Sequence, residues 1–132
     1  MKDAISILRQ CGIQPTPQRI AVVEYVLKCK LHPSADDVLS YARKKCPTVS
    51  RATVYNTLNL LVDKGLLAMQ IIKEGAVVFD PNVKKHHHFV DIDTGKIFDI
   101  PWDQLQVTGE EKLKDFEITG FQVVVRGRKK KR

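Results

Sequence analysis

Capping residues, prolines and glycines divide the first half of the chain into four short segments, and this division constrains the fold more than any other feature. Each segment carries apolar residues at helical spacing. Two β-rich runs follow, Leu66–Lys73 and Ala76–Asp80, and Glu74-Gly75 between them predicts a hairpin turn. Four helices and a two-stranded hairpin are typical of a winged helix-turn-helix, whose fourth helix here would enter the major groove of DNA.

The starts of the helices are marked by side chains that accept a backbone N–H. The expected caps of the second, third and fourth helices are Thr16 (followed by Pro17), Ser34 and Ser50. Asp37 would complete a capping box with Ser34. Helix by helix, the residues expected to face inward are Ala4, Ile7, Leu8 and Cys11; Ile20, Val23 and Leu27, with Val22 and Val26 flanking; Val38, Leu39 and Ala42; and Val54, Leu58, Leu61 and Val62.

The fourth helix, expected from Ser50 to about Lys64, has a polar outer face. The residues expected to point away from the core are Ala52, Asn56, Asn59 and Asp63, with Thr53 and Tyr55 beside them. Short polar side chains of this kind suit hydrogen bonds to base edges and phosphates. A four-helix packing unit with a solvated outer face is the alternative that the pattern leaves open.

Pro81-Asn82 is the expected domain boundary, so residues 1–80 would form the DNA-binding domain and residues 81–132 a small α/β dimerisation domain of an α+β protein. The elements predicted in the second domain are strands at His87–Asp91 and Lys96–Ile100, a helix at Val107–Ile118 and a strand at Phe121–Arg126. Because a domain this small is marginally stable alone, we expect a homodimer that completes its sheet across a two-fold axis.

The chain is basic, with 22 lysines and arginines against 15 acidic residues and a formal net charge of +7. Such a balance favours polyanionic partners, nucleic acid first. Part of the excess lies in the tail Arg126–Arg132, which we expect to be disordered, and a solvated segment that only aids solubility is the alternative.

The three cysteines, Cys11, Cys29 and Cys46, are widely spaced and form no CxxC pair. This spacing argues against disulfides and against a cysteine zinc site, so small buried side chains are the simpler interpretation. No apolar run approaches the ~20 residues that span a bilayer, and the N-terminus has no secretory pattern. We therefore expect a cytoplasmic protein with no membrane partner.

Three consecutive histidines are the strongest sign of chemistry. Alternate side chains of a strand share a face, so His86 and His88 would lie together and His87 opposite. The further candidate ligands are Asp99 on the next strand, Asp80 at the end of the first hairpin and His32 before the third helix. Imidazoles with carboxylates suit Fe²⁺ or Mn²⁺, whereas Zn²⁺ favours four ligands and softer donors. For an isolated histidine triplet, a solvated surface strand is the alternative.

Five segments, in order along nearly the whole chain, carry a resemblance to a known family. They are Thr16-Pro17-Gln18-Arg19, His32-Pro33-Ser34-Ala35-Asp36-Asp37, the SRATVYNTL stretch Ser50–Leu58, the histidine triplet and Gly95-Lys96-Ile97-Phe98-Asp99. Together they resemble the ferric uptake regulator family. The resemblance implies a metal-dependent transcriptional regulator, a repressor by family default and not an enzyme, that binds an inverted-repeat DNA operator as a homodimer.

Within the family, the chain is similar to the peroxide-responsive repressors. Asp99 matches an aspartate of those sensors where other members more often carry glutamate, and Asn56 matches their recognition helix. The regulatory ligands that the resemblance implies are His32, Asp80, His86, His88 and Asp99, holding Fe²⁺ or Mn²⁺, with Zn²⁺ possible in the same site. The DNA-contacting residues that it implies are Arg19, Ser50, Arg51, Thr53, Tyr55 and Asn56.

The resemblance also implies a mechanism of sensing. Bound iron would reduce hydrogen peroxide and the resulting oxidant would attack His32 or His86, which releases the metal and the DNA; Mn²⁺ would support DNA binding without this oxidation. Three alternatives stay open: an iron- or manganese-responsive uptake regulator of the same family, a non-haem iron enzyme built on two histidines and a carboxylate, and a metal-independent DNA-binding protein.

The chain departs from the family pattern at a second metal site. Most members hold a structural zinc with two CxxC pairs, but here Asp91 and Thr94 occupy the positions of the first pair and Arg128–Lys131 those of the second. We therefore expect no structural zinc, and a dimer that rests on sheet pairing and apolar burial. A late histidine that completes a further site in other members is also missing, so His87 is expected to have no ligand role.

Overall fold

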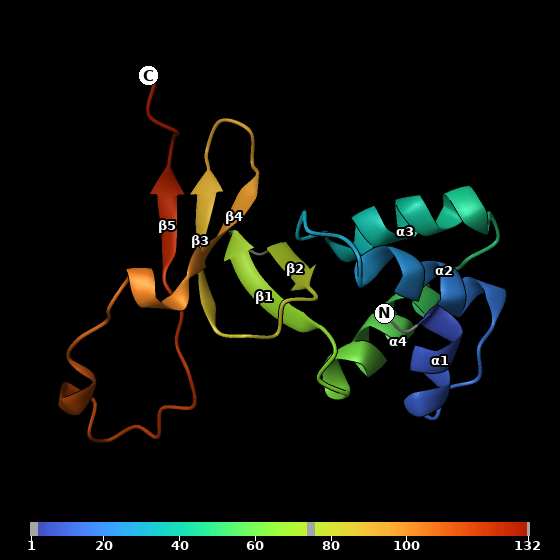
Figure 1. The fold of residues 1–132 in the computed structure, drawn as a ribbon, viewed down its shortest axis with the longest axis horizontal. Coiled ribbons are helices and arrows are strands. Elements are labelled where there is room, and N and C mark those ends of the chain that lie inside the picture. Colours follow the sequence, from blue (N-terminus) through green and yellow to red (C-terminus); the bar gives the residue numbers. More distant parts are fainter. Residues whose placement is uncertain (1–2, 74–75, 132) are drawn as a thin grey trace. The chain divides into compact units, whose positions relative to one another are not determined.

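The computed structural model describes residues 3–73 and 76–131, which fall into two compact units divided between Val83 and Lys84 (Figure 1). The expected α+β class is confirmed. The elements of the first unit are α1 (Ala4–Gln10), α2 (Pro17–Val26), α3 (Ala35–Lys45), α4 (Arg51–Asp63), β1 (Ala68–Lys73) and β2 (Ala76–Asp80). The turn expected at Glu74-Gly75 lies outside the described residues. Among those residues, no helix has the length and apolar content needed to cross a bilayer.

The predicted helix caps are confirmed. The hydroxyl of Thr16 accepts the N–H of Arg19 at 3.2 Å, and that of Ser50 accepts the N–H of Thr53 at 3.1 Å. Ser34 and Asp37 form the reciprocal capping box at the start of α3. Each cap satisfies N–H groups that have no partner within their own helix, so the helix starts are fixed by local sequence.

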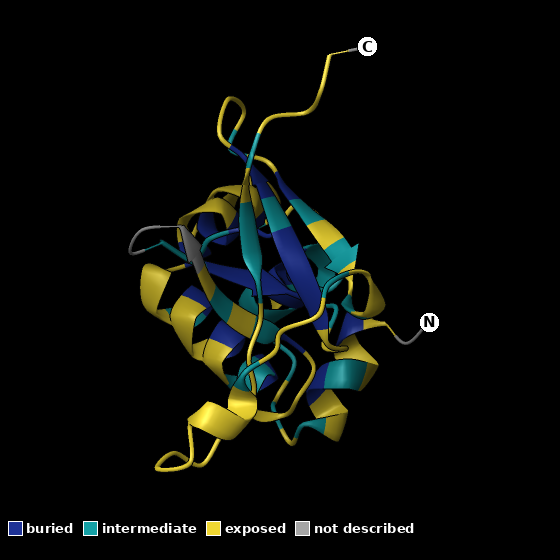
Figure 2. Ribbon diagram, turned by 90° about the vertical axis from the view of Figure 1, so that its left-hand side faces the viewer, coloured by how far each residue is buried: buried dark blue, intermediate teal, exposed yellow. Residues whose placement is uncertain are grey.

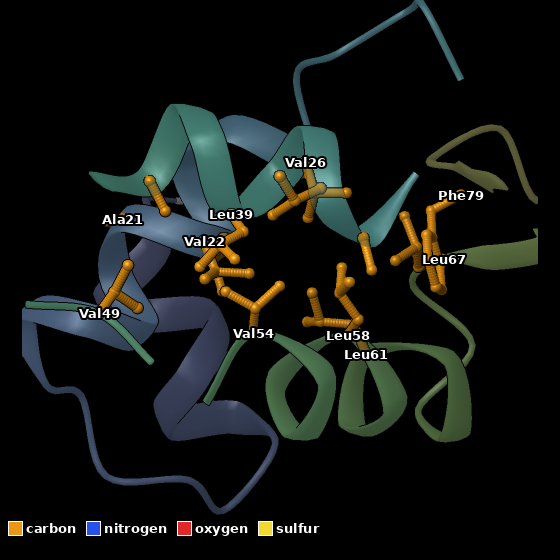
Figure 3. Close-up of a cluster of buried hydrophobic side chains, with 14 of the residues drawn as sticks. Ala21, Val22, Val26, Leu39, Val49, Val54, Leu58, Leu61, Leu67 and Phe79 are labelled. Carbon is orange, nitrogen blue, oxygen red and sulfur yellow. The ribbon is translucent and has the colours of Figure 1, made fainter. Parts of the chain in front are cut away.

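The core of the first unit lies between α2, α3 and α4 and extends to the hairpin (Figure 3). Val54, Leu58 and Leu61 of α4 are fully buried, as predicted. Leu67 and Phe79, at the base of the hairpin, are 2% and 3% exposed and join the same cluster. Each such side chain contributes about 1.5–3 kcal/mol through burial, so the core fixes the hairpin against the helices.

The predicted inner face of α2 is partly wrong. The buried residues of α2 are Ala21, Val22, Val23 and Val26, whereas Ile20 and Leu27 are only half-buried. Because α2 packs against α1, α3 and α4, its buried surface is wider than a single apolar stripe. This buried surface includes Val22 and Val26, which were expected only to flank the stripe.

The second unit is built on a three-stranded sheet in the order β4-β3-β5. Its elements are β3 (His86–Asp91), β4 (Ile97–Pro101), the short 3₁₀ turns η1 (Trp102–Gln104) and η2 (Glu110–Lys112), and β5 (Val124–Gly127). The central strand β3 pairs with β4 antiparallel, with His88 opposite Asp99, and with β5 parallel, with Asp91 opposite Gly127. This register decides which side chains of β3 and β4 meet.

The helix predicted at Val107–Ile118 does not form. The segment is extended apart from η2, and Gly109 adopts the left-handed φ of 99°, which an α-helix does not accommodate. Its apolar side chains are exposed within the unit, Phe116 by 70%, as the exposed colouring of this stretch in Figure 2 shows. Most of the stability of a short helix comes from burial of its apolar face, and none of the residues described in this unit buries the apolar side chains of this segment.

The end of the chain also differs from expectation. The last strand begins at Val124 rather than at Phe121, and it extends to Gly127. The tail was expected to be disordered from Arg126, but Arg126 lies in β5, and the side chains of Arg128 and Lys129 contact Asp93 and the ring of Phe98. The three cysteines are free thiols, with Cys29 buried and the other two half-buried.

Candidate metal centre and nucleic-acid interface

In the first unit, the structure brings His32 and Asp80 together. Nε2 of His32 lies 3.1 Å from Oδ2 of Asp80, and both side chains are buried, with 3% and 5% exposed. The other carboxylate oxygen accepts the N–H of Asn82 at 2.9 Å. The loop is fixed to β2 because the N–H of Phe79 donates to the carbonyl of Pro33 at 2.9 Å.

The backbone of His32 is unusual. Its φ of 54° lies in the left-handed region, and it is the one non-glycine residue with positive φ among those the structure describes. Such a conformation is sparsely populated for side chains with a Cβ and persists when surrounding contacts impose it. Here, it aims a buried imidazole at a buried carboxylate.

In the second unit, the structure brings His86, His88 and Asp99 together. The alternation of β3 puts both imidazoles on one face, with ring centroids 4.5 Å apart. Their Nε2 atoms lie 3.5 Å and 3.7 Å from the same oxygen, Oδ1 of Asp99. The rings are buried while the aspartate side chain is 40% exposed, so this group opens on the side of Asp99.

Hydrogen bonds to the far nitrogens orient both rings. Nδ1 of His86 lies 2.6 Å from the carbonyl of Lys84, and Nδ1 of His88 lies 3.0 Å from Oε1 of Gln122. Because carbonyl oxygens only accept, each Nδ1 carries a proton, and Nε2 is the ring nitrogen that faces the carboxylate. Lone pairs and a carboxylate repel one another unless a proton or a cation lies between them, and metal-binding histidines are typically oriented by such second contacts.

His87 occupies the opposite face of β3 and has a different environment. Its ring is fully buried, stacks on Trp102 with centroids 4.5 Å apart, and accepts the N–H of Val123 on Nδ1 at 2.9 Å. These contacts join β3 to the segment before β5. They give the ring a packing role.

The structure thus places the five expected ligands in two groups, one in each unit. The contacts of these rings with the carbonyl of Lys84 and the side chain of Gln122 were not predicted from the sequence. The backbone of Lys84 carries no sequence signal, and Gln122 lies 34 positions from His88. Nitrogen and carboxylate donors of this kind fit a divalent ion of intermediate softness, which favours Fe²⁺, Mn²⁺ or Zn²⁺ over Ca²⁺ or Mg²⁺.

The expected DNA-contacting residues lie on two sides of α4. A groove of about 420 Å³ brings Arg19 of α2 together with Thr53 and Asn56 of α4. Asn56 is exposed, whereas Thr53 is half-buried and its hydroxyl accepts that of Ser50 at 2.9 Å. Ser50 and Thr53 therefore serve first to begin the helix, and Arg19 and Asn56 offer the polar groups of the groove.

On the other side of α4, Arg51 and Tyr55 are exposed one turn apart. The guanidinium of Arg51 pairs with Asp36 at the start of α3, and this hydrogen bond and charge raise the pKa of Arg51. Because a guanidinium has five N–H donors, the pair leaves donors for a phosphate or a base edge. In a helix that enters the major groove, an exposed arginine on the first turn is well placed for such contacts.

Comparison with known proteins places these features in context. A model of the ferric uptake regulator family matches residues 10–126. The peroxide-responsive repressor PerR of Staphylococcus aureus (strain Mu50 / ATCC 700699) is 31% identical over 129 residues, which cover 96% of this chain and 87% of that protein.

Solved structures agree with that similarity. The ferric uptake regulator from Pseudomonas aeruginosa with manganese is 27% identical with a TM-score of 0.68, and the match covers 97% of this chain and 98% of that one. The Campylobacter jejuni peroxide stress regulator has a TM-score of 0.64 at 24% identity, over 98% of both chains, which is a likeness of fold.

Proposed function

Because this chain belongs to the ferric uptake regulator family, we propose that it is a metal-dependent DNA-binding repressor of the oxidative-stress response that senses hydrogen peroxide. The observation that carries the proposal is the convergence of two buried, oriented imidazoles on Asp99. The similarity to a peroxide-responsive repressor over nearly the whole chain supports it.

The proposed regulatory site unites the two groups of ligands around one ion. His32 and Asp80 from the first unit would join His86, His88 and Asp99 from the second, and Fe²⁺ or Mn²⁺ would be the resident metal, with Zn²⁺ accepted as well. Binding the ion would fix one unit against the other. Since two recognition helices must match half-sites spaced by whole turns of DNA, such a constraint would couple metal binding to DNA binding.

Iron in this site would supply the reducing power for peroxide, with His32 or His86 as the residue oxidised. An oxidised imidazole is a poorer nitrogen ligand, so the two units would separate and the DNA would be released. The orienting bond from His86 to the carbonyl of Lys84 would keep the ring facing the site before oxidation. Mn²⁺ would hold the same residues together without this reaction.

The proposed DNA contacts are Arg19, Arg51, Tyr55 and Asn56, with Ser50 and Thr53 at the start of the helix. We propose that a homodimer binds an inverted-repeat operator in the cytoplasm. Arg19 and Arg51 would neutralise phosphates or reach guanine edges, while the amide of Asn56 suits adenine.

Fluorescence anisotropy with an inverted-repeat duplex, at one salt concentration, tests the proposal. The conditions are chelator, Mn²⁺, and anaerobic Fe²⁺ before and after peroxide. We expect binding with either metal, lost after peroxide in the iron form alone. His32→Ala should lose metal-dependent binding, while His87→Gln, on the other face of β3, should retain it. Equal oxidation of the Mn²⁺ form would refute the sensing mechanism, and unchanged affinity of His32→Ala would remove His32 from the site.

A metal-responsive uptake regulator of the same family is the second candidate, favoured by the likeness to a ferric uptake regulator with manganese. It predicts metal-dependent DNA binding that ignores peroxide, so the same experiment separates the two. We propose no enzymatic activity, and steady turnover of a co-substrate by the iron form would contradict this.

A further inference from the structure

The basic tail continues β5 along the turn that joins β3 to β4. Asp91 and Gly127 are opposite one another in the parallel pair of β3 with β5, which lie side by side in Figure 1. The N–H of Ile92 donates to the carbonyl of Gly127 at 3.0 Å. The backbone thus delivers Arg128 and the residues after it to an acidic turn.

Opposite charges meet where the tail passes this turn. Nε of Arg128 lies 2.9 Å from Oδ1 of Asp93, and Nζ of Lys129 lies 4.6 Å from the centre of the Phe98 ring on β4. The carboxylate of Asp91 accepts the N–H groups of Asp93 and Thr94 at 2.9 Å and 3.4 Å. These backbone bonds lower the pKa of Asp91, and the charge of Lys129 adds to the effect. An ion pair, a cation–π contact and a strand pair therefore hold one short segment.

The same residues do not fit the structural zinc that the family pattern implies. A structural zinc site needs four thiolate or imidazole donors. The residues at the corresponding positions include Asp91, whose Oδ1 already accepts two hydrogen bonds, and Arg128, whose charge repels a divalent cation. Neither Arg128 nor the lysines that follow it offers a lone pair at neutral pH.

We propose that Arg128 and Lys129 act as positioning residues that close the sheet of the second unit onto Asp93 and Phe98, in place of a metal. We call this arrangement the ionic clasp. It makes the closure of β5 against β3 sensitive to salt and insensitive to chelators and thiol oxidants. It also assigns Arg128 and Lys129 to the fold rather than to DNA.

Hydrogen exchange of the Ile92 amide measures the clasp directly, because this amide donates to Gly127. The full-length protein is kept in chelator, without DNA, and followed by nuclear magnetic resonance. In Arg128→Gln we expect exchange about two- to fivefold faster, the range that an exposed ion pair supports. Arg128→Lys should recover part of the protection. The control Lys130→Gln removes the same charge from an exposed position and should leave the rate unchanged.

Salt and chelator supply the second readout. Raising NaCl to about 0.5 M should bring the wild-type rate toward that of Arg128→Gln, because screening weakens exposed pairs. In His86→Ala, which removes a proposed regulatory ligand, adding chelator should change neither the exchange rate of the Ile92 amide nor the thermal midpoint of the second unit. Equal rates in Arg128→Gln and Lys130→Gln, or loss of Ile92 protection when chelator is added to His86→Ala, would overturn the proposal. The measurement uses neither operator nor peroxide, so its outcome is independent of the proposed sensing function.

Discussion

Replacing His87 by alanine should destabilise the second unit without removing a metal ligand. The ring is fully buried, so its loss leaves a cavity beside Trp102 and removes the stacking contact at 4.5 Å. It also leaves the N–H of Val123 without its acceptor at 2.9 Å. A buried N–H group left without an acceptor lowers the free energy of unfolding by ~1–3 kcal/mol. Truncating a buried imidazole lowers it by somewhat less than the ~3–5 kcal/mol typical of Phe→Ala. The two effects overlap, and we expect a loss of about 3 kcal/mol in the free energy of unfolding.

Urea unfolding in chelator, followed by circular dichroism at a fixed protein concentration, measures this loss. His87→Gln retains a side-chain acceptor for Val123 and should lose about half as much. In a Mn²⁺ titration, His87→Ala should keep the wild-type stoichiometry, whereas His86→Ala should lose it. If His87→Ala is as stable as wild type, or binds metal as poorly as His86→Ala, the assignment of the two faces of β3 is wrong.

Three further predictions test other parts of the chain. Arg19→Ala should reduce the slope of log affinity for DNA against log salt concentration by about 1 without changing base preference. The control is Lys45→Ala, because the ammonium of Lys45 pairs with Glu24. An equal reduction of the slope in Lys45→Ala would count against a DNA contact by Arg19. Hydrogen bonds from Asp93 and Thr94 lower the pKa of Asp91 from its ordinary value of 3.8, so its carboxylate stabilises the fold above about pH 4 and loses this effect as the pH falls through the lowered pKa. In thermal unfolding, Asp91→Asn should therefore be less stable than wild type at pH 7, and the difference should shrink as the pH is lowered below about 4; a difference that does not change with pH would contradict this. Gly65→Ala should cost about 1 kcal/mol in thermal unfolding from its φ of 74° alone, since no atom of the described residues, apart from its chain neighbours, lies within 4 Å of the added Cβ; a neutral result would contradict the backbone argument.

The features that sequence predicted well are those set by neighbours in the chain. Thr16, Ser34 and Ser50 cap helices because each hydroxyl meets an N–H three residues away. The grouping of His86 with His88 follows from the two-residue period of a strand, and a short turn to β4 brings Asp99 opposite His88.

The features that sequence missed depend on distant partners. The periodicity of Val107–Ile118 shows that a helix there would be amphipathic. It does not show that another part of the protein packs against the apolar face of that helix. A single apolar stripe on α2 does not account for packing on several sides, so the expected inner face included Ile20 and left out Ala21. The tail was treated as a run of like charges, because the acidic turn that it meets is more than thirty positions earlier, as the Arg128–Asp93 separation of 35 shows.

The parallel pairing of β3 with β5 also sets the order of folding. His87 and Val123 are 36 positions apart, and the stretch between β4 and β5 buries little apolar surface on the way. Closing such a loop reduces the conformational entropy of the chain before burial of apolar surface can compensate for that loss. Each turn of α1 to α4, in contrast, forms from neighbouring residues. The helices should therefore form early and the sheet should close last. Trp102, the chain's one tryptophan, stacks on His87 and would report that final step by its fluorescence.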